Sequence, residues 1–272
     1  MLPRYTIFMK QLLTATLLLI FLTTQGQKNQ PKSPYDDFMK VFNTRLDTVQ
    51  WLCEYDKIAW WTSDSVYATS KEEQSKLGSE WFCFQSDGVW HALYGKYEQP
   101  DFKMIYHYVV DSDNHIYRTK QEIDTLTTNP FARALANAGS INEKFADTIS
   151  VHCNQYIKRN KYKTLSVWLL PAFTRSGIAV YGGEFYYLFD SSGANLISKN
   201  EYSIGYKGFK PDRKKKISLD YTSFKEPPLS AIFFVWYYKD YFDEIFVYSK
   251  DFVSSVIRGD DHYTWIHAAR QK

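Results

Sequence analysis

The sequence predicts an α+β fold built around antiparallel β-meanders of about eight to eleven strands, with an N-terminal helix and a central helical segment packed on the sheet. Three observations lead to this fold class. Short aromatic runs alternate with turns rich in Gly, Asp and Ser over most of the chain. Two segments instead repeat apolar residues at helical intervals. Runs such as "EFYYLF" and "AIFFVWYY" are apolar on both faces, so they need cover on both sides.

The first 26 residues have the pattern of a secretory signal peptide. Arg4 and Lys10 precede an uncharged, mostly apolar run from Leu12 to Thr24. Small residues around Gly26 suit a signal peptidase. The run falls short of the roughly 20 residues that span a bilayer, so we expect cleavage, with an uncleaved anchor as the alternative. A start at Met9 would leave a complete signal peptide as well, and the sequence does not decide between Met1 and Met9.

We expect residues 27–35 to be a flexible lead-in and residues 36–272 to form a single globular domain. Removal of residues 1–26 from the 272-residue chain leaves 246 residues, with 31 Lys and Arg against 30 Asp and Glu. A balance near +1 argues against nucleic acid or an anionic membrane as a partner. The basic run "RKKK" at 213–216 is typical of an exposed loop or of a sheet edge.

The helical expectations concern two regions. Residues 36–53 repeat apolar side chains every three or four positions, from Phe38 to Cys53. The next stretch, "KIAWWTSDSVYAT", resembles two short strands around a turn. Asn129 and Pro130 suit the N-cap and first position of a second helical region, 129–160. That region is predicted as two helices, or as one broken at Gly139.

The remaining segments predict strands. Ser86-Asp87-Gly88 separates two apolar runs and is a hairpin signal, and residues 111–114 form a second turn. After residue 160 we expect strands at "TLSVWLLPAF", "IAVYGG", "EFYYLFD", "ANLISKNEY", "KKISLDYTS", "SAIFFVWYY", "EIFVYSK" and "YTWIHA". Pro227-Pro228 marks a boundary before Leu229, because proline cannot donate to a β-ladder.

Two segments, 81–120 and 168–200, share an order of signals that suggests related meanders. Each has a tryptophan, a turn, a strand ending in Tyr-Gly and then an aspartate-led turn. The Tyr-Gly pairs begin at Tyr94 and Tyr181. The competing interpretation is that any two aromatic meanders with Gly and Asp turns resemble each other.

Common catalytic and cofactor motifs are missing from the sequence. It has no G-x-S-x-G, P-loop, G-x-G-x-x-G, H-E-x-x-H or C-x-x-C, so we assign no catalytic residue, no metal ligand and no cofactor. Cys53, Cys83 and Cys153 allow at most one intramolecular disulfide, and the sequence does not say whether any pair forms one.

The candidate binding residues are polar or aromatic side chains in unusual positions. His107 and Glu184 lie within aromatic strands, where burial would demand a partner or shift a pKa. Trp60, Trp61 and Tyr186 could offer stacking surfaces for a sugar or a peptide, and so could Trp90, Trp236 and Tyr237. The alternative is that all of these side chains are structural.

These observations favour an exported protein of bacterial type, periplasmic or extracellular, that binds an envelope glycan or protein without catalysis. It would not span the membrane once the signal peptide is removed. A hydrolase with dispersed acid and base residues, such as His107, Glu184 and Asp220, is the alternative. A purely structural envelope role is a third interpretation.

Overall fold

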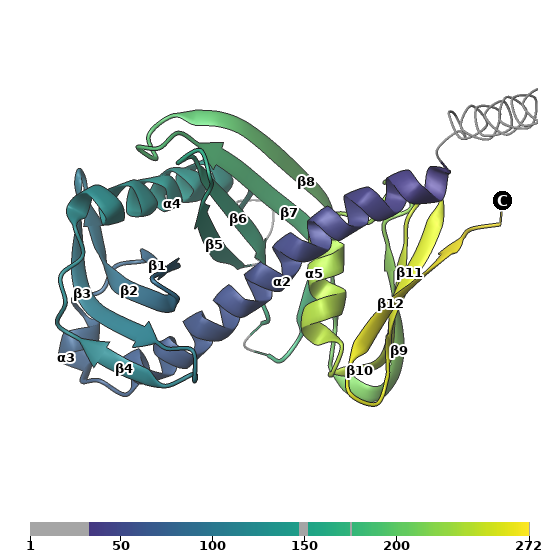
Figure 1. The fold of residues 1–272 in the computed structure, drawn as a ribbon, viewed down its shortest axis with the longest axis horizontal. Coiled ribbons are helices and arrows are strands. Elements are labelled where there is room, and N and C mark those ends of the chain that lie inside the picture. The colour runs from purple at the N-terminus through teal and green to yellow at the C-terminus, as the bar shows by residue number, and fades with distance from the viewer. Residues whose placement is uncertain (1–32, 147–151, 175, 272) are drawn as a thin grey trace, which may run out of the picture. The chain divides into compact units, whose positions relative to one another are not determined.

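A computed structural model of the chain describes residues 33–146, 152–174 and 176–271. The predicted signal peptide and most of the lead-in lie outside these residues. Within them the chain has four helices and three four-stranded sheets (Figure 1), which confirms the α+β class with antiparallel meanders. The chain divides into two compact units, Met1–Val41 and Phe42–Lys272. Apart from the first turns of the first described helix, all elements below belong to the second unit.

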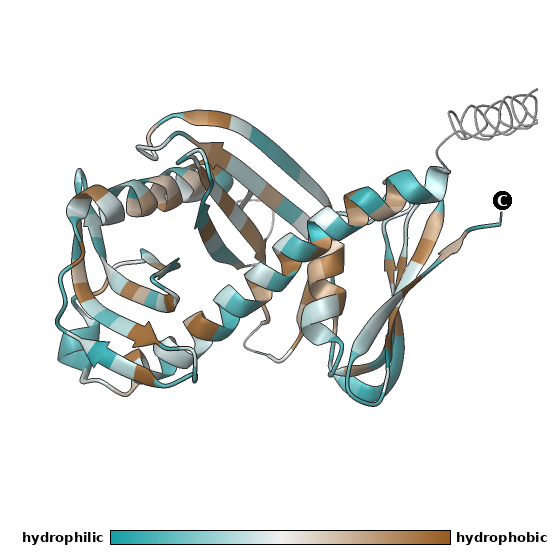
Figure 2. Ribbon diagram, in the orientation of Figure 1, coloured by the Kyte–Doolittle hydropathy of each residue, from teal (hydrophilic) through white to brown (hydrophobic). Residues whose placement is uncertain are grey.

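Helix α2 (Pro34–Tyr67) is longer than predicted. It includes residues 57–67 of the segment expected to form two short strands, so that expectation is wrong. The reason is visible in burial: Tyr55, Ala59, Thr62 and Val66 are all buried, and they continue the three- and four-residue spacing of the N-terminal half. Bands of polar and apolar residues run along the helix in Figure 2. The short helix α3 (Lys71–Gln74) follows.

The first sheet contains β1 (Trp81–Ser86), β2 (Val89–Glu98), β3 (Asp101–Val110) and β4 (Ile116–Thr119), hydrogen-bonded in chain order. The predicted hairpin is confirmed: Ser86 pairs with Val89 across a two-residue loop. Asp87 and Gly88 have φ of 53° and 81°, the left-handed conformations that a type I′ turn requires. The turn predicted at 111–114 is confirmed by the gap between β3 and β4.

Helix α4 (Thr125–Ala146) corrects the expected start at Asn129. Asn129 lies inside the helix, where its Oδ1 accepts the backbone N–H of Phe102 at 2.8 Å. Gly139 does not break the helix. Residues 147–151 of the predicted second helix lie outside the described residues, and from Cys153 the chain is a strand. The helix predicted there is wrong because long-range pairing decides the segment: Tyr156 pairs with Trp168.

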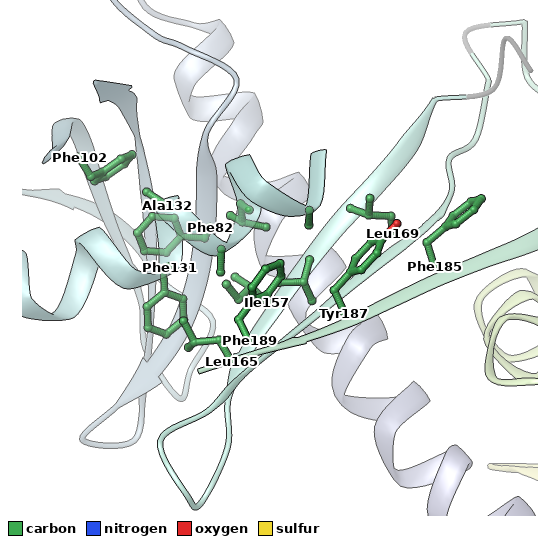
Figure 3. Packing of buried hydrophobic residues seen from close by; sticks show 14 of the residues in the cluster. Phe82, Phe102, Phe131, Ala132, Ile157, Leu165, Leu169, Phe185, Tyr187 and Phe189 are labelled. Atoms are coloured by element: carbon green, nitrogen blue, oxygen red, sulfur yellow. The ribbon is translucent and has the colours of Figure 1, made fainter. Parts of the chain in front are cut away.

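The second sheet contains β5 (Cys153–Arg159), β6 (Leu165–Pro171), β7 (Ala179–Phe189) and β8 (Leu196–Phe209), again in chain order. The runs "IAVYGG" and "EFYYLFD" form one strand, β7, with an irregularity between Tyr181 and Gly183. Phe185, Tyr187 and Phe189 alternate onto one face, as predicted. They pack with α4 and the first sheet in one buried cluster (Figure 3).

The third sheet has the order β12-β11-β10-β9. Its strands are β9 (Asp212–Asp220), β10 (Phe242–Tyr248), β11 (Phe252–Arg258) and β12 (Tyr263–Ala269). Strand β9 pairs in parallel with β10, and the crossover between them carries helix α5. The basic run at 213–216 is exposed on the edge strand β9, as the sequence indicated. No sequence signal had pointed to β11.

Helix α5 (Leu229–Tyr238) corrects the strand predicted at "SAIFFVWYY". Eight of its ten residues are buried, and in Figure 2 it is mostly apolar. A helix buried all round loses its 3.6-residue periodicity and cannot be told from a buried strand by pattern alone. The boundary at Pro227-Pro228 is confirmed, since Pro228 is the N-cap. Helix α5, the third sheet and the start of β7 form a second buried cluster.

Both antiparallel meanders have the same sequential strand order, but their Tyr-Gly pairs occupy different strands. Tyr94-Gly95 lies in the second strand of the first sheet and Tyr181-Gly182 in the third strand of the second sheet. Both pairs coincide with an irregularity in strand register. A common origin of the two meanders stays a prediction. Among the described helices, none combines the length and the apolar composition needed to cross a bilayer.

Candidate functional site

An aromatic cavity of about 350 Å³ lies where α2, α5 and the first two sheets meet. One face of α2 forms a wall of this cavity, through Asp56, Ala59, Trp60, Ser63 and Tyr67. These residues recur at three- and four-residue intervals, so they share one side of the helix. The sequence pattern did not indicate that residues 56–67 are helical. That helical conformation places these side chains together in one wall of the site.

The other walls are also largely aromatic. Trp81 on β1 pairs across the strands with Tyr94 on β2, and their rings stack with centroids 6.2 Å apart. Phe233 and Tyr237 are one turn apart on α5, and their rings stack at 5.3 Å. Tyr156 comes from β5, and Phe173 from the loop after β6. Such walls offer π-faces of large area, which suit flat or cationic groups.

Asp56 is the ionisable group at the centre of the site, and its side chain is 3% exposed. Its Oδ2 accepts the hydroxyl of Tyr237 at 2.6 Å. Its Oδ1 accepts the hydroxyl of Tyr156 at 2.8 Å and the amide of Asn154 at 3.3 Å. Burial raises the pKa of the Asp56 carboxyl, while these hydrogen bonds act in the opposite direction.

The phenols around Asp56 serve as hydrogen-bond donors. Burial, followed by the charge of Asp56, raises the pKa of both Tyr156 and Tyr237 far above neutrality. Among the described residues, no Lys, Arg or His lines the cavity. Asp56 is thus the one carboxyl among the described residues that line the cavity, and it can accept hydrogen bonds from a ligand.

Of the adjacent predicted tryptophans, Trp60 lines the cavity and Trp61 does not. The Trp60 side chain is 53% exposed, so it forms an accessible rim. Adjacent residues on a helix point in different directions, and Trp61 instead packs under Lys57, whose Nζ lies 4.2 Å from the ring centroid.

His107 lies on β3, away from the cavity lining, and is 2% exposed. Its Nε2 is 2.9 Å from Nδ1 of His91, and its Nδ1 is 2.9 Å from the carbonyl oxygen of Gln121. Desolvation lowers the pKa of both imidazoles. The sequence indicated that a buried His107 would need a hydrogen-bond partner, and its side-chain partner is a second histidine, His91.

Glu184 and Tyr186 lie on β7, also outside the cavity lining. The Glu184 carboxylate accepts the backbone N–H of Ser230 at 2.8 Å and the hydroxyl of Tyr202 at 3.0 Å. Burial raises its pKa. The Tyr186 hydroxyl is 3.0 Å from that of Ser166. Of the predicted residues, the structure therefore brings Trp60 and Tyr237 to the cavity.

Sequence reasoning missed most residues of the site, including Asp56, Trp81, Tyr94 and Tyr156. The available signal was spacing. Asp56 follows the buried Val49 and Leu52 by seven and four positions, so a carboxyl interrupts the apolar stripe of α2. This spacing can be recognised only if the helix is predicted to continue beyond residue 53.

Two further groups of side chains have ordinary explanations. Asp111, Asp113 and His115 bring ligand atoms within 4.8 Å of one another. Their hydrogen bonds stay within the turn, where Oδ1 of Asp111 accepts the N–H groups of Asp113 and His115. The three cysteines are free thiols. Burial raises the pKa of Cys53 and Cys153 to about 12, and that of Cys83 still further.

Searches of family models, curated proteins and solved structures find nothing that matches this chain.

Proposed function

We propose that the chain is an exported, non-catalytic binding protein of the cell envelope, and that the aromatic cavity around Asp56 receives part of an envelope glycan or protein. The observation that carries this proposal is the composition of the cavity: aromatic walls, one buried carboxyl and an exposed tryptophan at the rim. Ligand sites are typically concave, largely apolar and equipped with a few polar groups that orient the ligand.

The aromatic side chains support binding in two ways. Trp60 keeps about half of its surface exposed, at 53%, although burial of a tryptophan is favourable, so a ligand can gain contact area there. The stacked pairs Trp81–Tyr94 and Phe233–Tyr237 hold their rings in place. A rigid wall loses little conformational entropy when a ligand binds.

A hydrolase is the alternative proposal, and the arrangement of its candidate residues supports it less well. His107, Glu184 and Asp220 lie in three different sheets. Each is hydrogen-bonded to neighbours of its own, such as Thr222 for Asp220. An active site requires titratable groups that converge on one point. Binding is therefore the function we favour.

Co-sedimentation of the purified protein with bacterial envelope fragments tests the proposal. We expect the wild type to sediment with the envelopes and Trp60→Ala to bind about tenfold more weakly, because a stacking platform is removed. Trp61→Ala is the matched control, since Trp61 does not line the cavity. Envelopes digested with protease or with glycan hydrolases distinguish the two kinds of ligand.

Failure of the wild type to sediment would overturn the proposal, and so would equal binding by the wild type and Trp60→Ala. Circular dichroism of each variant shows that a loss of binding is not a loss of fold.

A further inference from the structure

The carboxylate of Asp56 is buried without a counter-charge in the part of the chain that the structure describes. Its three hydrogen-bond donors, Asn154, Tyr156 and Tyr237, are all neutral side chains. No ion pair within the described residues involves Asp56, whereas the ion pairs of the molecule form elsewhere, as between Arg45 and Glu226. Buried charges in proteins are normally paired, because desolvation of a lone charge is costly.

The Asp56 carboxyl has hydrogen-bond acceptor capacity that its three donors do not use. A carboxylate has about four acceptor sites, and Asp56 uses three of them. Two nearby hydroxyl donors already have acceptors: the hydroxyl of Tyr94 donates to the carbonyl of Ala59, and that of Ser63 to the carbonyl of Trp60. The Asp56 carboxyl therefore keeps an acceptor site that these hydroxyls do not fill. This favours a ligand group that donates hydrogen bonds or carries positive charge.

The aromatic walls fit the same kind of group. The negative faces of Trp and Tyr rings attract ammonium and guanidinium groups within about 6 Å of the ring centroid. The chain uses this contact repeatedly outside the cavity. Lys57 lies 4.2 Å from the ring centroid of Trp61, and Lys158 lies 4.7 Å from that of Trp51. At the cavity, Trp60, Trp81 and Tyr237 offer rings of these types, and none of these three has a cation–π partner among the described residues.

We infer that the cavity binds a positively charged ammonium group of its ligand, with Asp56 as counter-charge and the rings of Trp60, Trp81 and Tyr237 around the cation. This inference rests on the proposed binding function and names the chemical class that the cavity selects. An anionic group is disfavoured because it would meet a buried carboxylate and no described basic side chain. A neutral sugar ring would find stacking surfaces but would leave the buried carboxyl without a counter-charge.

A pair of probes that differ only in charge tests the inference. Choline carries a quaternary nitrogen, and 3,3-dimethylbutan-1-ol replaces that nitrogen by carbon at nearly the same shape. We expect choline to quench the tryptophan fluorescence of the intact protein at a concentration about tenfold lower than the alcohol does. Asp56→Asn keeps the shape of the side chain and should abolish this preference. Asp64→Asn, an exposed change on the same helix, should retain it.

Each outcome bears on the inference. Equal affinity for choline and its carbon isostere, or an unchanged preference in Asp56→Asn, would overturn it. Binding of N-acetylglucosamine in place of choline, with loss in Trp60→Ala, would overturn the ammonium assignment and leave the binding function standing. If neither probe nor envelope fragments bind, both the inference and the proposed function fail. Thermal unfolding of both aspartate variants confirms that they are folded.

Discussion

The carboxylate of Glu184 accepts the backbone N–H of Ser230 at 2.8 Å, so a strand of the second sheet caps helix α5. The N-cap residue of that helix, Pro228, has no side-chain hydrogen bond of its own. The first N–H groups of a helix need acceptors, and a carboxylate at this end also interacts favourably with the helix dipole. Glu184 therefore joins the second sheet to the helix that carries Phe233 and Tyr237.

We predict that Glu184→Ala lowers the free energy of unfolding by about 2–4 kcal/mol, because the buried N–H of Ser230 loses its acceptor and the Tyr202 hydroxyl loses one of its two partners. Glu184→Gln keeps one acceptor oxygen and should cost less. Denaturant unfolding measures both changes. The exposed Glu122 provides the control, and its change to Ala should stay within about 0.5 kcal/mol. Equal stability of Glu184→Ala and the wild type would show that the cap is dispensable.

The buried pair of His91 and His107 predicts loss of stability in acid. Desolvation lowers the pKa of both imidazoles in the folded protein, and their mutual repulsion adds to the effect at His91. The unfolded chain titrates near its usual pKa of about 6.5. Below that pH the two imidazoles bind protons in the unfolded state but not in the folded state, so the free energy of unfolding falls. Burial also lowers the pKa of His267 to about 4, which extends the loss to that pH.

Urea unfolding between pH 7.5 and 4 measures this loss. The double variant His91→Phe, His107→Leu removes the pair, and we expect its stability to change less with pH than that of the wild type. The comparison isolates the pair from Glu184, whose raised pKa works in the opposite direction: the cost of burying its charge disappears as it is protonated. Identical pH profiles for the two proteins would contradict the prediction.

Gly182 illustrates a close approach that only glycine allows. It lies at the irregularity of β7 with φ of 114°, and an added Cβ would be 2.3 Å from the carbonyl oxygen of Gly205 on β8. We predict that Gly182→Ala destabilises the fold by at least about 2 kcal/mol. Thermal unfolding measures the change.

Gly139 is the matched control for that substitution. It lies within α4, and an added Cβ would meet open space. Alanine is the better helix former, so Gly139→Ala should stabilise the protein by up to about 1 kcal/mol. If both substitutions have the same sign, the contact with β8 does not explain the role of Gly182.

The three thiols should be unreactive in the folded protein. Burial raises the pKa of Cys53 and Cys153 to about 12 and that of Cys83 still further. At pH 8 we expect a thiol reagent to label the native protein at least about a hundredfold more slowly than the unfolded chain. Unfolding without a reductant should expose all three thiols. Recovery of a single thiol would reveal a disulfide.

Several parts of the fold could be predicted because they depend on neighbouring residues alone. The Asp87-Gly88 hairpin follows from turn chemistry, and the break at Pro228 follows from proline's missing N–H. The alternation of Phe185, Tyr187 and Phe189 correctly indicated one core-facing side of a strand. Among the site residues, Trp60 and Tyr237 were found in this way, as members of aromatic runs.

The sequence by itself determined the fold class, the tight turns and the core-facing side of β7, because local backbone preferences and the two-residue strand period act within a few residues. Tertiary structure decided the state of residues 57–67, 153–159 and 229–238. Their apolar patterns suit a buried helix and a buried strand alike, so packing partners distant in sequence select one. The same packing brings Asp56 of α2 to Tyr156 of β5 and Tyr237 of α5. No local sequence pattern indicates that these three side chains come together, and their contact creates the site.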